Sequence, residues 1–183
     1  MASHIKEIRY STFPKTVPPD ILAVEVVNIF KSHLETISTV ELKKGHKSDK
    51  ILQILSSDLR KIGFDVEMGK SKDKKIHRPV FFGENGEQTV KYEIDAYHRE
   101  RKFGLEIEAG RAWKGNAVYR DLIISLLLID VEHLILAVPL TYKYKSKKKD
   151  LANTDYRYAK NLIDNLYSQT RFKLPYNLTL IGY

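Results

Sequence analysis

Two short segments decide the fold: KYEIDAY at residues 91–97 and FGLEIE at residues 103–108. Each segment alternates acidic with apolar residues, which is the period-2 pattern of a half-buried strand. Only a short polar connection separates the two segments, so they are typical of the paired strands of a β-hairpin.

The alternation places the acids of this hairpin on one face. Successive side chains of a strand point to opposite faces, so Ile94 and Ala96 are expected to share the core face. The second strand repeats the pattern, and its apolar residues are expected on the same core. The opposite face then gathers four carboxylates: Glu93, Asp95, Glu106 and Glu108.

Helices and further strands surround the hairpin. Apolar periodicity and capping residues predict helices over residues 20–37, 48–61, 116–130 and 154–168. Further strands are predicted over residues 64–68, 131–140 and 178–181, whereas residues 1–18 and the lysine-rich segment 141–150 are expected to be irregular. We therefore expect one α/β (α+β) domain over residues 1–183, with a mixed central sheet flanked by helices. In this scheme an N-terminal helical portion covers residues 1–46, and the α/β core covers residues 47–183.

Composition limits the classes of function. The net charge of +8 and the pI near 9.4 favour polyanionic partners, although an excess of lysine also serves solubility alone. The chain has no cysteine, which excludes disulfides, thiolate zinc sites and iron–sulfur clusters. The longest apolar run, near residues 122–129, is too short to span a bilayer, so a cytoplasmic protein without membrane contact is expected.

The clustered acids have two readings. Like charges opposite each other on paired strands destabilise a hairpin by a few tenths to about 1 kcal/mol per pair, and a bound cation removes this conflict. Only oxygen ligands are present, so the fitting ions are hard ones such as Mg²⁺, Mn²⁺ or Ca²⁺. Alternatively, the acids form a solvated face that neighbouring basic residues neutralise: Lys91, Arg99, Arg101 and Lys102.

The pattern of Asp95, a short hairpin, the segment 106–108, a helix and a buried strand resembles the PD-(D/E)xK nuclease superfamily. The resemblance implies a restriction-endonuclease-like core and a Mg²⁺ (or Mn²⁺) cofactor held by Asp95, Glu106 and the backbone carbonyl of Ile107. Glu108 falls where most members have lysine, so the chain looks closer to an ExE variant of the motif. In such a variant Glu108 would hold a second ion or act as general base. No residue is then assigned to the role that the lysine has in other members.

Basic residues supply candidate phosphate contacts. Near the acids these are Arg111, Lys114 and Arg120. The others fall in two lysine clusters, and such clusters are more often solvated loops than contact surfaces: Lys72, Lys74 and Lys75 (with Lys70 and Arg78), and Lys145 and Lys147 (with Lys143, Lys148 and Lys149). Tyr142 and Tyr144 alternate with the second cluster, which favours nucleic acid because aromatic rings stack on bases.

Three functions remain open from the sequence. The first is a Mg²⁺-dependent endonuclease acting on double-stranded DNA, such as a type II restriction endonuclease, for which a homodimer is expected if both strands are cut symmetrically. The second is a catalytically inactive nuclease fold that only binds nucleic acid or a protein. The third is an ordinary α/β interaction domain with acids on its surface.

Overall fold

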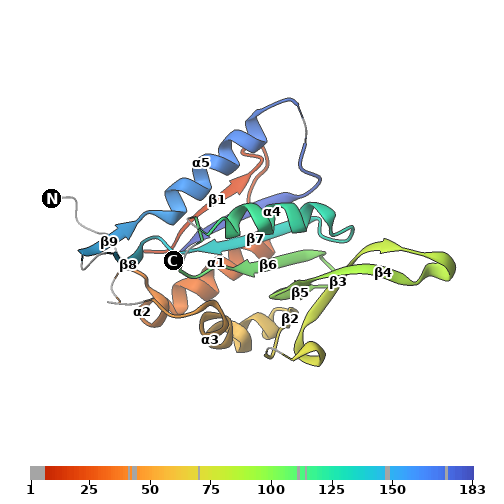
Figure 1. Ribbon diagram of the computed structural model, residues 1–183, viewed down its shortest axis with the longest axis horizontal. Coiled ribbons are helices and arrows are strands. Elements are labelled where there is room, and N and C mark those ends of the chain that lie inside the picture. The colour runs from red at the N-terminus through yellow and green to blue at the C-terminus, as the bar shows by residue number, and fades with distance from the viewer. Residues whose placement is uncertain are drawn as a thin grey trace.

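The computed structural model describes residues 7–40, 42, 45–69, 71–110, 112–113, 115–146, 149–171 and 173–183, with only the backbone of residues 145–146 and 149–150. A six-stranded sheet in the order β1-β10-β7-β6-β5-β2 forms its centre (Figure 1). These strands are β1 (Arg9–Phe13), β2 (Asp65–Val66), β5 (Ala96–His98), β6 (Phe103–Ile107), β7 (His133–Val138) and β10 (Asn177–Gly182).

The sheet is mixed. β7 runs parallel to both of its neighbours, β6 and β10, whereas β1, β2 and β5 join by antiparallel pairs. Every residue of β7 is buried, as the near-continuous apolar sequence of residues 131–140 predicted for a central strand.

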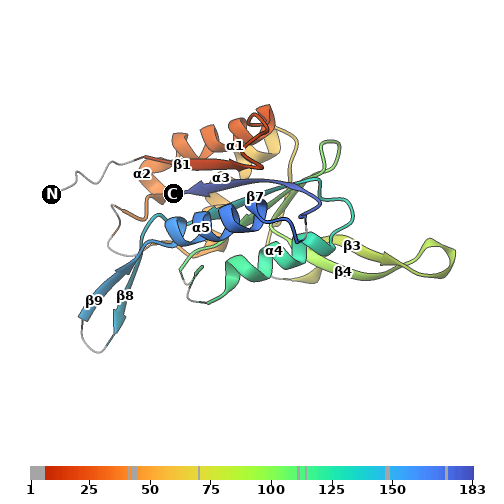
Figure 2. The ribbon, with the colours of Figure 1, turned by 90° about the horizontal axis from the view of Figure 1, so that it is seen from above.

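Helices cover both faces of the sheet. α1 (Ile21–Ser32), the short α2 (Leu34–Ile37) and α3 (Ser48–Lys61) lie on one side, and α4 (Ala117–Leu127) and α5 (Asp155–Ser168) on the other (Figure 2). Two hydrophobic cores result, one on each face of the sheet. The mixed α/β class with a sheet flanked by helices is thus confirmed.

The helix predictions hold with adjusted ends. Asp20 caps α1 by accepting a hydrogen bond from the Leu22 N–H at 2.8 Å, and the predicted helix 20–37 is divided at His33. α3 ends in front of Gly63, whose φ of +94° suits the residue after a helix. α3 begins at Ser48 with Lys47 as its N-cap, and Thr154 is the N-cap of α5, although its side chain makes no capping hydrogen bond.

Two predictions of irregular structure are wrong. Residues 9–13 form the edge strand β1, which pairs with β10 although it shows little apolar alternation, since backbone pairing at an edge requires little burial. Residues 142–146 and 149–153 form the hairpin β8 (Tyr142–Ser146) and β9 (Lys149–Asn153). Its alternating tyrosines are a strand signal that the high lysine content concealed.

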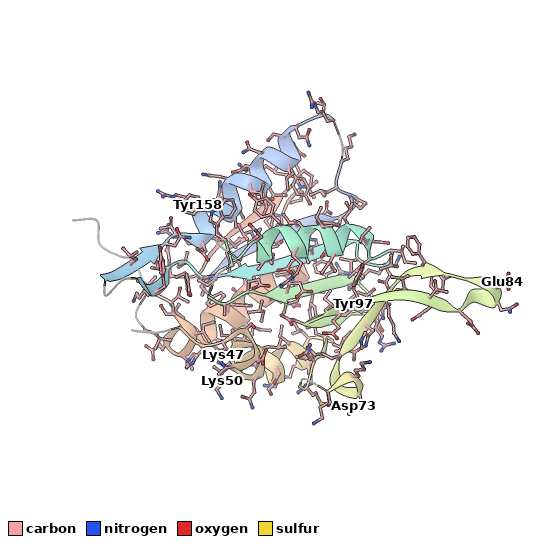
Figure 3. The ribbon with its side chains drawn as sticks, viewed as in Figure 1. Lys47, Lys50, Asp73, Glu84, Tyr97 and Tyr158 are labelled. Atoms are coloured by element: carbon pink, nitrogen blue, oxygen red, sulfur yellow. The ribbon has the colours of Figure 1, made fainter. Side chains whose placement is uncertain are left out.

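The first strand of the predicted hairpin is two strands. Residues 88–94 form β4 (Gln88–Ile94), which pairs with β3 (Ile76–Phe82) in a separate two-stranded arm, and β5 then joins the main sheet. The arm projects far from the body of the protein, with Glu84 at its tip and Tyr97 near its base (Figure 3). Two short 3₁₀ turns, Lys72–Lys74 and Glu84–Gly86, flank β3.

The division of this strand at Asp95 changes the sheet faces on which its side chains were predicted to lie. Ile94 packs in the core under α4 and α5, whereas Ala96 packs in the core under α1 and α3. The expectation that both share one face is therefore wrong, because the strand is interrupted at Asp95 and its alternation does not continue across that residue.

Candidate active site

Asp95 occupies the single position between β4 and β5. Its carbonyl accepts a hydrogen bond from the Glu67 N–H at 2.9 Å, which fixes the backbone at the junction. Its carboxylate Oδ2 accepts the Ile107 N–H at 2.8 Å, so the side chain lies across β6. The junction thus places one carboxylate on the sheet face that α4 covers.

Glu106 lies on the same face. Its neighbours in β6, Leu105 and Ile107, are buried in the core under α1 and α3, and the alternation turns Glu106 toward α4. The side chain is half-buried beside Asp95. The structure therefore brings together the two acids that the sequence assigned to metal binding.

Glu108 follows β6 and is held firmly. Its N–H donates to the Ala137 carbonyl at 2.8 Å, and its own carbonyl accepts from the Tyr183 hydroxyl at 2.6 Å. Its carboxylate, 16% exposed, forms an ion pair with Arg120 of α4. Glu108 thus lies beside the other acids but has a cationic partner of its own.

A fourth acid, Asp121 of α4, is part of the site and was missed from the sequence. Only 3% of its side chain is exposed, and its Oδ1 accepts a hydrogen bond from Arg120 Nε at 3.0 Å. Its Oδ2 is buried and has no hydrogen-bond partner among the described residues. The sequence pattern that could have revealed Asp121 is an acidic residue on the buried side of a helix, between the apolar residues Val118 and Leu122.

Asp95, Glu106 and Asp121 line a pocket of about 480 Å³, whereas Glu108 is not part of its lining. The wall opposite α4 comes from the loop after β2 and from the arm. There Lys75 pairs with Glu67 at 2.8 Å and with Glu93 at 3.4 Å. The lining comprises Glu67, Lys75, His77, Lys91, Tyr92, Glu93, Ile94, Asp95, Glu106, Arg120, Asp121 and Ile124.

Burial raises the pKa values of all the inner acids, and repulsion by neighbouring acids adds to the rise for Asp95, Glu106 and Glu108. Burial raises the pKa of Asp95 to about 7, although the Ile107 N–H lowers it in part. Burial, with the charges of Asp95 and Asp121, raises the pKa of Glu106 well above its usual value. Burial and the neighbouring Asp121 raise the pKa of Glu108 to about 8, and burial also raises the pKa of Asp121. Clustered carboxyl groups with raised pKa values are typical of functional sites.

Within the part of the chain that the structure describes, no three acidic or histidine side chains form a ready ligand set for a metal ion. Asp95 Oδ2 is directed at the Ile107 N–H, and Glu108 is directed at Arg120. The donor chemistry nevertheless fits a hard cation, because the donors are carboxylate oxygens and one of them, Asp121 Oδ2, is buried without a partner.

The sequence of this chain matches a known protein family. A family described as "Putative halobacteria restriction endonuclease" matches residues 2–181. The chain belongs to this family. No curated protein sequence matches the chain.

Solved structures place this member of the halobacterial restriction-endonuclease family in a known fold. A crystal structure of restriction endonuclease BglII in complex with a DNA 16-mer is similar at a TM-score of 0.52 and 14% identity, over 96% of this chain and 75% of that one. Free BglII matches at a TM-score of 0.46 and 14% identity, over 96% and 78%. At this identity the likeness to the DNA-bound enzyme shows the fold alone, which is restriction-endonuclease-like.

The predicted basic residues of this family member fall into three groups. Arg120 is paired with Glu108 and Asp121, and Lys75 with Glu67 and Glu93. Lys72 and Lys74 are exposed in the turn before β3. Arg111, Lys114, Lys147 and the side chain of Lys145 lie outside the described residues, as do Lys70, Lys148 and the side chain of Lys149.

Two further basic candidates have structural roles. Lys143 donates hydrogen bonds from Nζ to the carbonyls of Val40 and Leu42, at 2.6 and 2.8 Å. Arg78 forms an ion pair with Asp130, and its guanidinium lies 4.1 Å from the centre of the Tyr97 ring. Both side chains hold segments together, which leaves the pocket and the turn before β3 as the described basic surface near the acids.

None of the described helices is long and apolar enough to cross a membrane.

Proposed function

We propose that this protein is a divalent-metal-dependent endonuclease that hydrolyses phosphodiester bonds of double-stranded DNA. The observation that carries the proposal is the cluster of Asp95, Glu106 and Asp121 in the pocket with Glu108 beside them, all four with raised pKa values. Folding alone does not favour such a cluster, because each buried carboxylate pays for its desolvation and repels the others. Membership in a restriction-endonuclease family supports the same reaction class.

Asp95, Glu106 and the Ile107 carbonyl would hold the ion, Mg²⁺ or Mn²⁺, and Asp121 Oδ2 is a further oxygen at the same place. When bound there, such an ion would supply positive charge to neutralise the scissile phosphate and would make a bound water more acidic. The Ile107 N–H orients the Asp95 carboxylate, and the apolar side chain of Ile94 lines the same pocket.

Glu108 fits the role of general base. A base is most effective when its pKa lies near the working pH, and burial beside Asp121 raises the pKa of Glu108 to about 8. Its oxygen accepts the proton of the attacking water, and the adjacent Arg120 stabilises the ionised form before that step. In this assignment Arg120, rather than a lysine on the strand, supplies the positive charge of the site, and the motif is the ExE variant.

A DNA cleavage assay tests this function. We expect the protein to convert supercoiled plasmid to nicked or linear DNA in Mg²⁺ or Mn²⁺ but not in EDTA. Glu108→Gln is expected to reduce the cleavage rate by about 10² to 10⁴-fold, the usual contribution of a general base. Glu106→Gln should abolish cleavage and weaken Mn²⁺ binding measured by calorimetry.

The matched control is Glu93→Gln, because Glu93 is 53% exposed at the rim of the same pocket and pairs with Lys75. This variant should retain cleavage within a few fold. Folded protein that cleaves no DNA or RNA in any divalent ion, or a Glu106→Gln variant with full activity, would contradict the proposal.

A non-catalytic nuclease fold is the second candidate. It is favoured by one observation, that the acids as they lie do not form a ready ligand set and Glu108 is engaged by Arg120. This alternative predicts salt-dependent retention of DNA with no cleavage and no Mn²⁺ binding in calorimetry, so the same two measurements distinguish the candidates.

A further inference from the structure

The arm formed by β3 and β4 has two parts of different character. Its proximal part forms one wall of the pocket, to which His77, Lys91, Tyr92 and Glu93 contribute. Its distal part, residues 81–89, is called the distal arm; it projects from the body of the protein, and all of its residues are exposed (Figure 1). The arm is therefore continuous with the pocket at one end and surrounded by solvent at the other.

The tip of the distal arm is ordered by its backbone. The Gly83 N–H donates to the Glu87 carbonyl at 2.7 Å, and the Glu87 N–H donates to the Glu84 carbonyl at 3.2 Å. The adjacent side chains of Phe81 and Phe82 are 60% and 53% exposed, so they bury little surface in the folded chain. Two exposed phenylalanines on a projecting hairpin therefore indicate a contact with another molecule.

The distal arm lacks the cations that bind phosphates. Residues 79–90 contain no lysine or arginine, although these two types make up 31 of the 183 residues of the chain. The other hairpin of the protein differs, because β8 and β9 carry Lys143, Lys145 and Lys149. On the proximal part of the arm, by contrast, the exposed Lys91 lies at the pocket. Residues suited to the DNA backbone thus lie at the base of the arm and not at its tip.

The exposed groups of the distal arm match the edges of bases instead. In the major groove an amide side chain pairs with adenine, a carboxylate accepts from the amino group of cytosine, and an apolar side chain contacts the thymine methyl group. The distal arm presents amides, carboxylates and apolar rings: Asn85 and Gln88, Glu84 and Glu87, and Phe81 and Phe82. Phosphates repel the two carboxylates, which disfavours a position of the tip along the DNA backbone.

The dimensions of the arm suit the major groove beside the pocket. This groove is about 12 Å wide and about 8.5 Å deep, and it admits a two-stranded β-ribbon such as the one that β3 and β4 form. From His77 in the pocket lining to Glu84 at the tip, a strand that rises 3.4 Å per residue spans roughly 20–25 Å (Figure 3). One turn of B-DNA is about 34 Å long, so a phosphate in the pocket leaves the tip beside bases of the same turn.

We propose that the distal arm lies in the major groove of duplex DNA and reads its base sequence, while the pocket holds a phosphate of the same turn. Duplex DNA as the ligand rests on the proposed function. Gln88 pairs with the edge of an adenine, Phe81 contacts a thymine methyl group, and Lys91 at the base of the arm binds the backbone.

Selection of binding sites from a randomised duplex library tests this assignment. The full chain is used with Ca²⁺ in place of Mg²⁺ and again in EDTA, so that cleavage is not required. We expect the wild type to enrich a defined sequence. Gln88→Ala should lose about 5- to 150-fold of the discrimination at one base pair. A wild type that enriches no sequence in either condition, or Gln88→Ala and Phe81→Ser variants that both enrich the wild-type sequence unchanged, overturns the proposal.

The salt dependence of binding separates base contacts from backbone contacts. The slope of log affinity against log salt concentration should be unchanged in Gln88→Ala, because an amide on a base edge releases no counterion. Lys91→Ala is the matched comparison on the same strand. It should lower the magnitude of the slope by about 0.9 and leave the selected sequence unchanged. A Gln88→Ala variant that changes the slope and not the sequence preference overturns the proposal.

Disulfide trapping locates the tip and keeps the test decisive if Gln88→Ala fails to fold. The chain has no cysteine, so Glu84→Cys introduces a single thiol at the tip. Duplexes carry a thiol tether at successive positions, either on cytosine N4 in the major groove or on guanine N2 in the minor groove. Glu84→Cys should be trapped by major-groove tethers only, and Asn161→Cys, at an exposed position of α5, by neither. Equal yields from the two grooves, or from the two variants, overturn the proposal.

Phe81→Ser also tests for a protein occupant of the arm. If the arm joins two copies of this chain, Phe81→Ser lowers the mass measured by light scattering without DNA and leaves the sequence preference intact, which overturns the proposal. The outcome is separate from the nuclease test. Sequence selection without cleavage in any divalent ion refutes only the nuclease, and cleavage with an unaltered preference in the arm variants refutes only the reading arm.

Discussion

Asp95→Asn in the absence of metal tests whether the acid cluster destabilises the folded protein. The pKa of Asp95 rises from 3.8 to about 7 on folding, chiefly through burial. Since each tenfold change in proton affinity is worth about 1.4 kcal/mol, the full cost of ionising this side chain in the folded protein is about 4 kcal/mol. Solvent screening and the titration of the neighbouring acids reduce the expected net effect to about 1–3 kcal/mol.

The sign follows from proton binding. Between pH 4 and 7 the folded state binds more protons at Asp95 than the unfolded state, so the free energy of unfolding falls as the pH rises through this window. It reaches its low plateau above pH 7. Asparagine keeps an acceptor oxygen for the Ile107 N–H but carries no charge. The free energy of unfolding of the variant therefore does not fall at this position as the pH rises.

The assay is thermal and urea unfolding in EDTA at pH 5 and pH 8. We expect Asp95→Asn to be more stable than wild type at pH 8, by about 3–10 °C in Tm for a chain of this size, and the gap to shrink at pH 5. Mg²⁺ should raise the Tm of the wild type at pH 8 but not that of the variant. Glu93→Gln, at the exposed rim, should change stability by less than about 0.5 kcal/mol. A variant less stable than wild type at pH 8, or a gap independent of pH, would refute the reasoning.

Three further predictions concern charge and packing. Arg120→Gln removes the cation that favours ionised Glu108, so the acidic limb of the pH–rate profile for cleavage should move to higher pH, with partial recovery in Arg120→Lys. Gly104→Ala places a methyl group 2.5 Å from Ile94 Cδ1, so unfolding experiments should show a loss of about 1–3 kcal/mol, while Gly45→Ala, with only an ordinary contact at 3.6 Å, should be nearly neutral. Duplex DNA binding should weaken with salt, with a log–log slope of about −0.9 for each phosphate contacted, and a salt-independent affinity would argue against electrostatic DNA binding.

Local patterns predicted much of the fold. α3 agrees with its prediction over residues 48–61, and β7 lies within the predicted strand 131–140, because an amphipathic helix and a two-sided buried strand leave clear periodic signals. The edge strand β1 and the hairpin of β8 and β9 leave weaker signals, since backbone pairing stabilises them more than burial of side chains.

The site was predictable in part. Alternation in β6 correctly placed Glu106 away from Leu105 and Ile107, and Glu108, just after the strand, lies near enough for its charge to act on Glu106. The interruption at Asp95 was not predictable, because it depends on β4 pairing with β3 rather than with the main sheet. Asp121 had a readable signal, an acid within an apolar helical stripe, which became meaningful only with knowledge of which strand α4 covers.

The base of the arm is tied to the body of the protein at a few points. Arg78 of β3 pairs with Asp130, and the Ile129 N–H donates to the Pro79 carbonyl. On the other strand, the chain passes from the arm to the main sheet through Asp95 alone. A twist of the arm therefore acts on the backbone of Asp95, which carries one of the pocket carboxylates. A partner that binds near Glu84 and bends the arm would change the orientation of this carboxylate.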